Sequence, residues 1–156
     1  MVDEVRRLYH DLIPGNVEDL GLTKALRTLV EDFADLQEDI DWQVDLPNLD
    51  GLFSLPVQTI IYRLMQEALT NIGKHAEPEQ VRVSAVPEDG RVNFVIQDDG
   101  KGFDTDKVLH QAEGLGMVAM EERLSMVGGT FEVWSQKGEG TKLFFSIPTL
   151  LEEEKS

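Results

Sequence analysis

The sequence predicts an α+β protein, a two-layer sandwich in which a mixed, mostly antiparallel sheet carries helices on one face. Apolar residues recur at helical spacing in three segments, at 22–38, 55–75 and 117–127. Alternating polar and apolar residues predict strands at 39–46, 80–87, 91–97, 130–136 and 141–148. Short turns join neighbouring strands as hairpins, and such paired strands with separate helices are typical of a two-layer fold.

The first half of the chain begins with a helical pattern at 3–12, which Pro14 and Gly15 are expected to end. The next helix, 22–38, places its apolar side chains on one face: Leu22, Leu26, Leu29, Val30, Phe33 and Leu36. The strand at 39–46 has its apolar residues on one side: Ile40, Trp42, Val44 and Leu46.

The segment 55–75 has the longest helical pattern. Ser54 is its expected N-cap, and Pro56 suits its first turn. The apolar face comprises Ile61, Leu64, Met65, Ala68 and Ile72. After it, the sequence Glu88-Asp89-Gly90 is expected to form a hairpin turn, and Gly128-Gly129 to end the helix 117–127.

Size and charge narrow the class of protein. The 156 residues, 41% of them hydrophobic, suit one globular domain with a single core. A formal net charge of −16 argues against a nucleic-acid surface or contact with an anionic membrane. The absence of cysteine excludes disulfides and thiolate metal sites and is compatible with the cytoplasm. We find no apolar run long enough to span a membrane and no secretory signal, and the start within a helical pattern suggests a fragment.

The long helix carries a polar stripe beside its apolar face. Glu67, Asn71, Lys74 and His75 lie at i, i+4, i+7 and i+8, so they share one side of the helix. An amide oxygen suits Mg²⁺ when phosphate oxygens complete the coordination, and a lysine can meet a phosphate. The carboxylate could orient or deprotonate a nucleophile. The alternative is a solvated helix face with no ligand.

An acidic, glycine-rich sequence follows the strand 91–97. Asp98 at the end of a buried strand can accept a hydrogen bond from an exocyclic amino group, and Gly100 and Gly102 allow the backbone to approach a flat ring. The alternative is a simple acidic turn. The whole segment 98–116 lacks periodicity, which is typical of a functional lid or a disordered loop.

Two further glycine-rich sequences complete the candidate site. Gly114, Leu115 and Gly116 open the helix 117–127, where free N–H groups can bind phosphate; the alternative is an ordinary glycine-rich helix entry. Thr141 follows a hairpin turn, and its hydroxyl could also point at a base. Neither a dinucleotide-binding fingerprint nor a P-loop is present.

In this order, the motifs resemble the ATP-binding domain of sensor histidine kinases. QEALTNIGKHA resembles the family's N box, and DDGKGFD its first glycine box, D-x-G-x-G. GLGM with MEERLSMVGG resembles the second glycine box, and GEGTKLFFSIP the closing G-x-G-T strand. The K-H-A ending of the N box, with RRLYHDLIPGNVEDLGLTKALR upstream, is similar to the subfamily of nitrate sensors and membrane-fluidity sensors.

The resemblance implies a GHKL-type ATPase sandwich with a lid at about 103–113. Asp98 would hold the adenine amino group, and Asn71 would ligate Mg²⁺. Glu67 would be a candidate base or water-orienting group, with Lys74 and His75 near the phosphates. Thr141 would contact the base. The pocket and its lid would be shaped by Gly100, Gly102, Gly114, Leu115 and Gly116.

By the same resemblance, residues 15–150 would be the catalytic domain, 1–14 the end of a dimerisation helix with its linker, and 151–156 a solvated tail. The domain would bind Mg-ATP and transfer the γ-phosphoryl to a histidine on a separate dimerisation domain, which serves a response regulator. It would work in the cytoplasm, either free or as the cytoplasmic part of a membrane-anchored sensor. Without most of the dimerisation helices, the chain is expected to be monomeric.

Some positions depart from the family pattern. The phosphoacceptor motif is absent; His10 superficially resembles it, but Pro14 follows closely, so His10 fits the end of the second dimerisation helix. Glu121 stands where many relatives carry a basic residue, and His110 in the lid has no assigned role.

Two alternatives share the predicted fold. One is a serine-kinase-type anti-sigma regulator, which the linker-like upstream sequence argues against. The other is a non-catalytic nucleotide-binding module, which the presence of Asp98 and Asn71 argues against.

Overall fold

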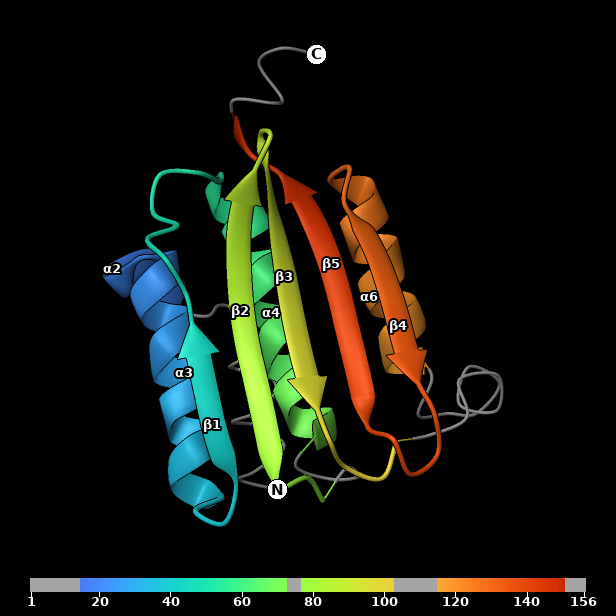
Figure 1. The fold of residues 1–156 in the computed structure, drawn as a ribbon. Helices are drawn as coiled ribbons and strands as arrows, with labels where there is room; N and C mark the ends of the chain where they lie inside the picture. The colour runs from blue at the N-terminus through green and yellow to red at the C-terminus, as the bar shows by residue number, and fades with distance from the viewer. Residues whose placement is uncertain (1–14, 73–76, 103–114, 151–156) are drawn as a thin grey trace, which may run out of the picture.

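The computed structural model describes residues 15–72, 77–102 and 115–150, and its centre is a five-stranded sheet in the order β1-β2-β3-β5-β4 (Figure 1). β1 pairs with β2 in parallel, and the other neighbouring pairs are antiparallel. The strands are β1 (Asp41–Asp45), β2 (Gln80–Glu88), β3 (Arg91–Asp98), β4 (Thr130–Ser135) and β5 (Thr141–Pro148). The helices are α2 (Gly15–Leu20), α3 (Leu22–Leu36), α4 (Leu55–Asn71) and α6 (Leu115–Met126).

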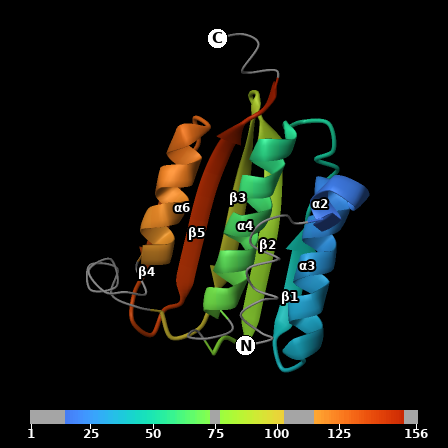
Figure 2. The same cartoon turned by 180° about the vertical axis from the view of Figure 1, so that it is seen from behind.

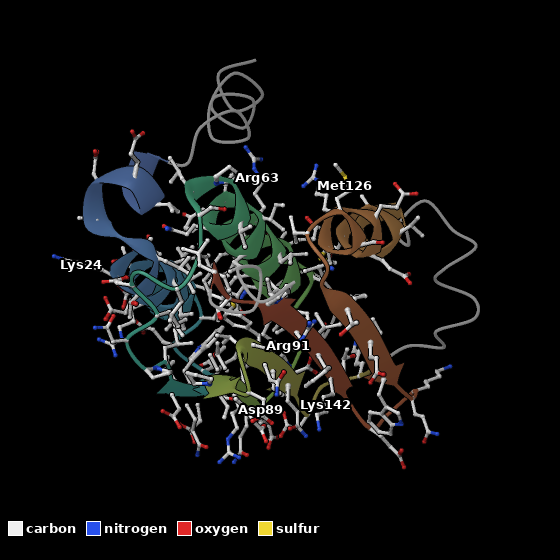
Figure 3. The ribbon with its side chains drawn as sticks, turned by 90° about the horizontal axis from the view of Figure 1, so that it is seen from above. Lys24, Arg63, Asp89, Arg91, Met126 and Lys142 are labelled. Carbon is white, nitrogen blue, oxygen red and sulfur yellow. The ribbon has the colours of Figure 1, made fainter. Side chains whose placement is uncertain are left out.

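The described helices all cover one face of this sheet, as the view from behind shows (Figure 2). Seen from above, helices and strands form two separate layers, with Arg63 and Met126 in the helix layer (Figure 3). The predicted fold class, a mixed sheet with helices on one face, is therefore confirmed. In the described part of the chain, no helix combines the length and the apolar character needed to cross a membrane.

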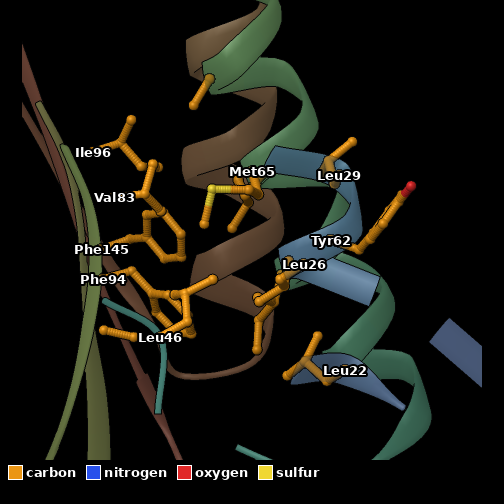
Figure 4. Packing of buried hydrophobic residues seen from close by; sticks show 14 of the residues in the cluster. Leu22, Leu26, Leu29, Leu46, Tyr62, Met65, Val83, Phe94, Ile96 and Phe145 are labelled. Atoms are coloured by element: carbon orange, nitrogen blue, oxygen red, sulfur yellow. The ribbon is translucent and has the colours of Figure 1, made fainter. Parts of the chain in front are cut away.

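The core lies between the two layers, where alternate residues of the central strands face the helices (Figure 4). In β3, buried side chains alternate with more exposed ones, and its buried set is Val92, Phe94, Ile96 and Asp98. The fully buried rings of Phe94 on β3 and Phe145 on β5 stack with centroids 4.7 Å apart and planes 14° apart. Such a pair stabilises a fold beyond the area it buries, so it helps hold β3 against β5.

Helix α4 packs its predicted apolar face on the sheet, since Ile61, Leu64, Met65, Ala68 and Ile72 are all buried. Pro56 lies in its first turn as expected, because the ring suits a position whose N–H has no helical partner. Ser54 is the N-cap by position, but its hydroxyl makes no capping hydrogen bond. The last residues of the predicted helix, 73–75, lie outside the described residues.

Several predicted boundaries differ from the structure. The hairpin between β2 and β3 turns on Asp89 and Gly90 alone, with φ of 52° and 76°, so Glu88 stays in the ladder opposite Arg91. Both residues adopt positive φ, as the tight hairpin turn that matches strand twist requires. β1 is shorter than the predicted strand at both ends, and α6 begins two residues before the predicted 117. Its C-terminus follows the prediction, because Gly128 has φ of 77° and the Gly129 N–H donates to the Leu124 oxygen.

The sequence pattern gave no indication of α2, a short helix that Gly21 separates from α3. Gly21 has φ of 83°, which an L side chain rarely adopts. The start of α3 is capped from a distance: Asp50 Oδ1 accepts hydrogen bonds from the backbone N–H of Thr23 at 3.1 Å and from its hydroxyl at 2.9 Å. The same hydroxyl oxygen accepts the N–H of Leu49 at 2.8 Å. This network joins the α2–α3 corner to the loop before α4.

We expect Asp50→Ala to lower the free energy of unfolding by about 1–2 kcal/mol, because it leaves a helix N–H and the Thr23 hydroxyl without their acceptor. Asp32→Ala, at an exposed position in the middle of α3, is the control and should change it by less than about 0.5 kcal/mol. Urea denaturation followed by circular dichroism measures both. Equal effects of the two substitutions would contradict the capping role.

Candidate nucleotide-binding site

The described parts of the predicted site lie at one end of the sheet. α4 ends there at Asn71, β3 ends at Asp98, and β5 begins at Thr141, as both views of the ribbon agree (Figures 1 and 2). α6 starts at the same end with Leu115. The fold thus brings to one end of the sheet segments that are at least 17 residues apart in sequence. The remaining predicted residues Lys74, His75 and Gly114 lie outside the described residues, as do His10 and His110.

Asp98 is a buried acid, with 5% of its surface exposed. Its Oδ1 accepts the backbone N–H of Gly100 at 2.8 Å. Burial raises the pKa of the Asp98 carboxyl above its ordinary value of 3.8; the Gly100 N–H opposes this, the charge of Asp99 adds to it, and the Thr141 backbone opposes it weakly. Because the folded state holds this proton more tightly than the unfolded chain, Asp98 lowers the folding stability as pH rises from the ordinary carboxyl pKa through the raised one.

The glycines around Asp98 are required by close backbone packing. Gly102 has φ of 63°, and a Cβ there would lie 2.0 Å from the Gln136 oxygen. A Cβ on Gly140 would lie 2.1 Å from the backbone carbonyl oxygen of Asp98. The Gly138 N–H donates to the Lys101 oxygen at 2.5 Å, which fastens the 98–102 segment to the β4–β5 turn. Position 102 therefore requires glycine, as predicted. The predicted reason was the approach of a flat ring, whereas the reason seen among the described residues is contact with the β4–β5 turn.

Thr141 stands opposite Asp98 in the pairing of β3 with β5. Its Oγ1 lies 2.9 Å from Ser135 Oγ, and Ser135 Oγ donates to the Gly140 oxygen at 2.9 Å. Since a serine hydroxyl has one proton, Thr141 donates to Ser135 when Ser135 donates to Gly140. Thr141 would then offer a ligand an acceptor oxygen. Ser135 escaped the sequence analysis because it looks like any strand-end serine.

The polar stripe of α4 is partly accessible. Glu67 and Asn71, one turn apart, are both half-buried, and neither side chain has a hydrogen bond to a described residue. Both side chains are thus partly exposed at the end of α4 that faces the candidate site. Within the described ranges, no group of three or more His, Asp or Glu side chains could hold a metal by itself. The assignment of Asn71 to Mg²⁺, and a common cavity for Asn71 and Asp98, stay predictions.

The sequence analysis also missed Asp99. Its Oδ1 accepts the backbone N–H groups of Glu79 and Gln80, each at 2.9 Å, so it joins the start of β2 to the end of β3. The sequence did offer a signal: consecutive residues at a strand end point in opposite directions, so Asp98 and Asp99 had to have different partners. Glu121, the position that departs from the family pattern, lies exposed on α6.

A groove of about 510 Å³ lies elsewhere, between α3 and the edge strand β1. Its walls include Arg27, Glu31, Trp42 and Asp45, and it contains none of the predicted site residues. It therefore has no part in the predicted chemistry.

Comparison with known proteins identifies a family model and relatives that match this chain. Residues 57–151 match the family model described as histidine kinase-, DNA gyrase B-, and HSP90-like ATPase. The sensor histidine kinase LiaS of Bacillus subtilis is 33% identical over 97% of this chain, which spans 41% of LiaS.

Solved structures of histidine kinases share the fold. The histidine kinase domain of the Erythrobacter litoralis EL346 blue-light activated kinase aligns with a TM-score of 0.72 at 20% identity, over 85% of this chain and 63% of that one. Full-length ShkA in complex with AMPPNP aligns with a TM-score of 0.68 at 22% identity, over 81% of this chain and 30% of ShkA.

We expect Gly102→Ala to destabilise the fold by about 1–3 kcal/mol more than Gly138→Ala. Both glycines have positive φ, so both substitutions strain the backbone, but a Cβ at Gly138 meets nothing within 4 Å. The difference between the two free energies of unfolding, from urea titrations, isolates the clash with the Gln136 oxygen. Equal losses would mean that the 98–102 segment does not pack on the turn as described.

Proposed function

The chain belongs to the family of histidine kinase-, DNA gyrase B- and HSP90-like ATPases, and from this we propose that it is the ATP-binding catalytic domain of a sensor histidine kinase. The observation that carries the proposal is the buried Asp98 carboxyl at the end of β3, surrounded by backbone that only glycine permits. A buried carboxyl keeps acceptor capacity beyond the Gly100 N–H that it already binds, and this suits the amino edge of a flat base. ShkA, which shares the fold, was solved with an ATP analogue.

The residues present fit Mg-ATP. Asp98 would accept the adenine amino group, and Thr141 would contact the base through its oxygen. At the end of α4, Asn71 would hold Mg²⁺, which supplies neutralisation of phosphate charge. Glu67, one turn earlier, would orient the accepting group. Lys74 and His75 would lie by the phosphates. Gly114, Leu115 and Gly116 would place the free N–H groups of α6 there.

The reaction proposed is transfer of the γ-phosphoryl of ATP to a histidine nitrogen, which leaves ADP. The accepting histidine would lie on a separate dimerisation domain, and a response regulator would receive the phosphoryl group from it. Because the chain spans only 41% of the length of LiaS, both of these partners are part of the proposal. We propose that this domain works in the cytoplasm as a monomeric unit with its catalytic part at 15–150.

We expect Asp98→Asn to weaken Mg-ATP binding by about 1–3 kcal/mol, because the amide replaces one acceptor oxygen by a donor. Asn71→Ala should remove mainly the magnesium-dependent part of the affinity. Calorimetric titrations with ATP, with magnesium and with EDTA, measure both. Asp45→Asn, an exposed position on the edge strand, is the control and should leave the affinity unchanged. Unaltered binding by Asp98→Asn would remove Asp98 from the adenine role.

Mixing the chain with the acceptor-helix fragment of its parent kinase should give acid-labile, alkali-stable phosphate on that fragment, as phosphohistidine requires. The signal should appear with radiolabelled γ-phosphate and be lost in Glu67→Gln, if Glu67 orients the acceptor. ATP binding without any transfer would instead favour the non-catalytic nucleotide-binding module. Phosphate that survives acid on a partner serine would favour the anti-sigma kinase.

A further inference from the structure

We propose that Asp99 is a positioning residue of the nucleotide site: its carboxylate fastens the segment Glu77–Gln80 to the end of β3, beside Asp98. This inference rests on the proposed function and extends it, because the family motif assigns the site's acid to Asp98 and leaves the next position open. Asp99 itself would not touch the nucleotide. It would set the distance between the strand that ends in Asp98 and the residues Glu79 and Gln80 at the start of β2.

The contact consists of several hydrogen bonds between the same two segments. Asp99 Oδ1 accepts the N–H groups of Glu79 and Gln80, both at 2.9 Å, and the Asp99 N–H donates to the Gln80 oxygen at 3.3 Å. Hydrogen bonds to a charged carboxylate are stronger than neutral ones. A single side chain thus satisfies two consecutive N–H groups where β2 begins.

The segment Glu77–Gln80, which Asp99 holds, also contacts β1 and Lys101. The Glu79 oxygen accepts the N–H of Asp41 at 2.9 Å, so the same residue joins the edge strand β1. Glu77 has φ of 44°, a conformation that a glutamate rarely adopts unless its surroundings hold it. An exposed ion pair of 3.1 Å between Lys101 and Glu77 adds a second contact between these segments. Asp99 is also exposed, but its short side chain binds two backbone N–H groups directly, whereas the ion pair joins two long exposed side chains and contributes little. We therefore assign this contact to Asp99.

The placement of this contact gives it a function. α4 ends at Asn71, and only the short connection 72–78 separates it from the amides held by Asp99. On the other side, Asp98 is the residue directly before Asp99. Asp99 therefore joins the residue next to Asp98 to a segment that follows Asn71 closely in the sequence, in addition to the packing of α4 on the sheet.

The test compares Asp99→Ala with Asp99→Asn in the full chain. The amide oxygen of asparagine can still accept both N–H groups, whereas alanine cannot. We expect Asp99→Ala to weaken Mg-ATP binding three- to tenfold and to speed hydrogen exchange of the Glu79 and Gln80 amides about tenfold. Asp99→Asn should stay within about twofold of the unmodified chain in both measurements. Lys101→Ala, which breaks only the exposed ion pair, is the control and should also stay within about twofold.

The outcomes separate this inference from the proposed function. If the unmodified chain binds no ATP, the proposed function fails, while exchange at Glu79 and Gln80 still reports on the contact. If ATP binds and Asp99→Ala binds it equally well, the positioning role is overturned. Weakened binding in Asp99→Asn with its amides still protected would also overturn it, since charge alone would then be the cause. Should Asp99→Ala not fold, Asp99→Ser replaces it, because its hydroxyl is too short to reach both amides.

Discussion

The register between β3 and β5 is the constraint on which the rest of the structure depends. It places Phe94 opposite Phe145 in the core and Asp98 opposite Thr141 at the end of the sheet. The stacked rings are fully buried, so a slip of one residue would move one of them to the solvent face. The same slip would separate Asp98 from Thr141. Packing in the middle of the sheet therefore determines which side chains meet at its end.

Helix α4 positions Glu67 and Asn71, two residues of the candidate site that do not lie on the sheet. Its buried face and its polar stripe belong to one rigid element, so packing of Met65 and Ala68 on the sheet also fixes where Glu67 and Asn71 stand. Neither polar side chain is consumed by a hydrogen bond within the described part of the chain. The core and the candidate site thus use neighbouring faces of the same helix, so we expect a substitution in the core face to displace the polar side chains of α4.

The periodicity of the sequence predicted the helices and strands that depend on local residue patterns. The apolar face of α4, the alternation in β3 and the glycines after α6 all express local rules, and the structure confirms them. The family, too, followed from short motifs in order. What the pattern did not predict depends on partners distant in sequence: Asp50 caps α3 from 27 residues away, and Asp99 reaches residues 19 and 20 positions before it. The structure places Asn71 and Asp98 at the same end of the sheet, while a cavity that they share stays a prediction.

The chain passes out of β5 at the end of the sheet opposite the candidate site (Figure 1). There the N–H and the hydroxyl of Thr149 both donate to the Gly90 oxygen at 2.9 Å, and the Leu150 N–H donates to the Leu52 oxygen. An eight-residue strand spans roughly 25 Å. A biotin or a fluorescent dye coupled beyond residue 150 would therefore start from the far pole of the molecule. Surface immobilisation through that end would leave the end of the sheet that carries Asp98 and Thr141 facing the bulk solution, so it suits the attachment of a sensor that tests nucleotide binding.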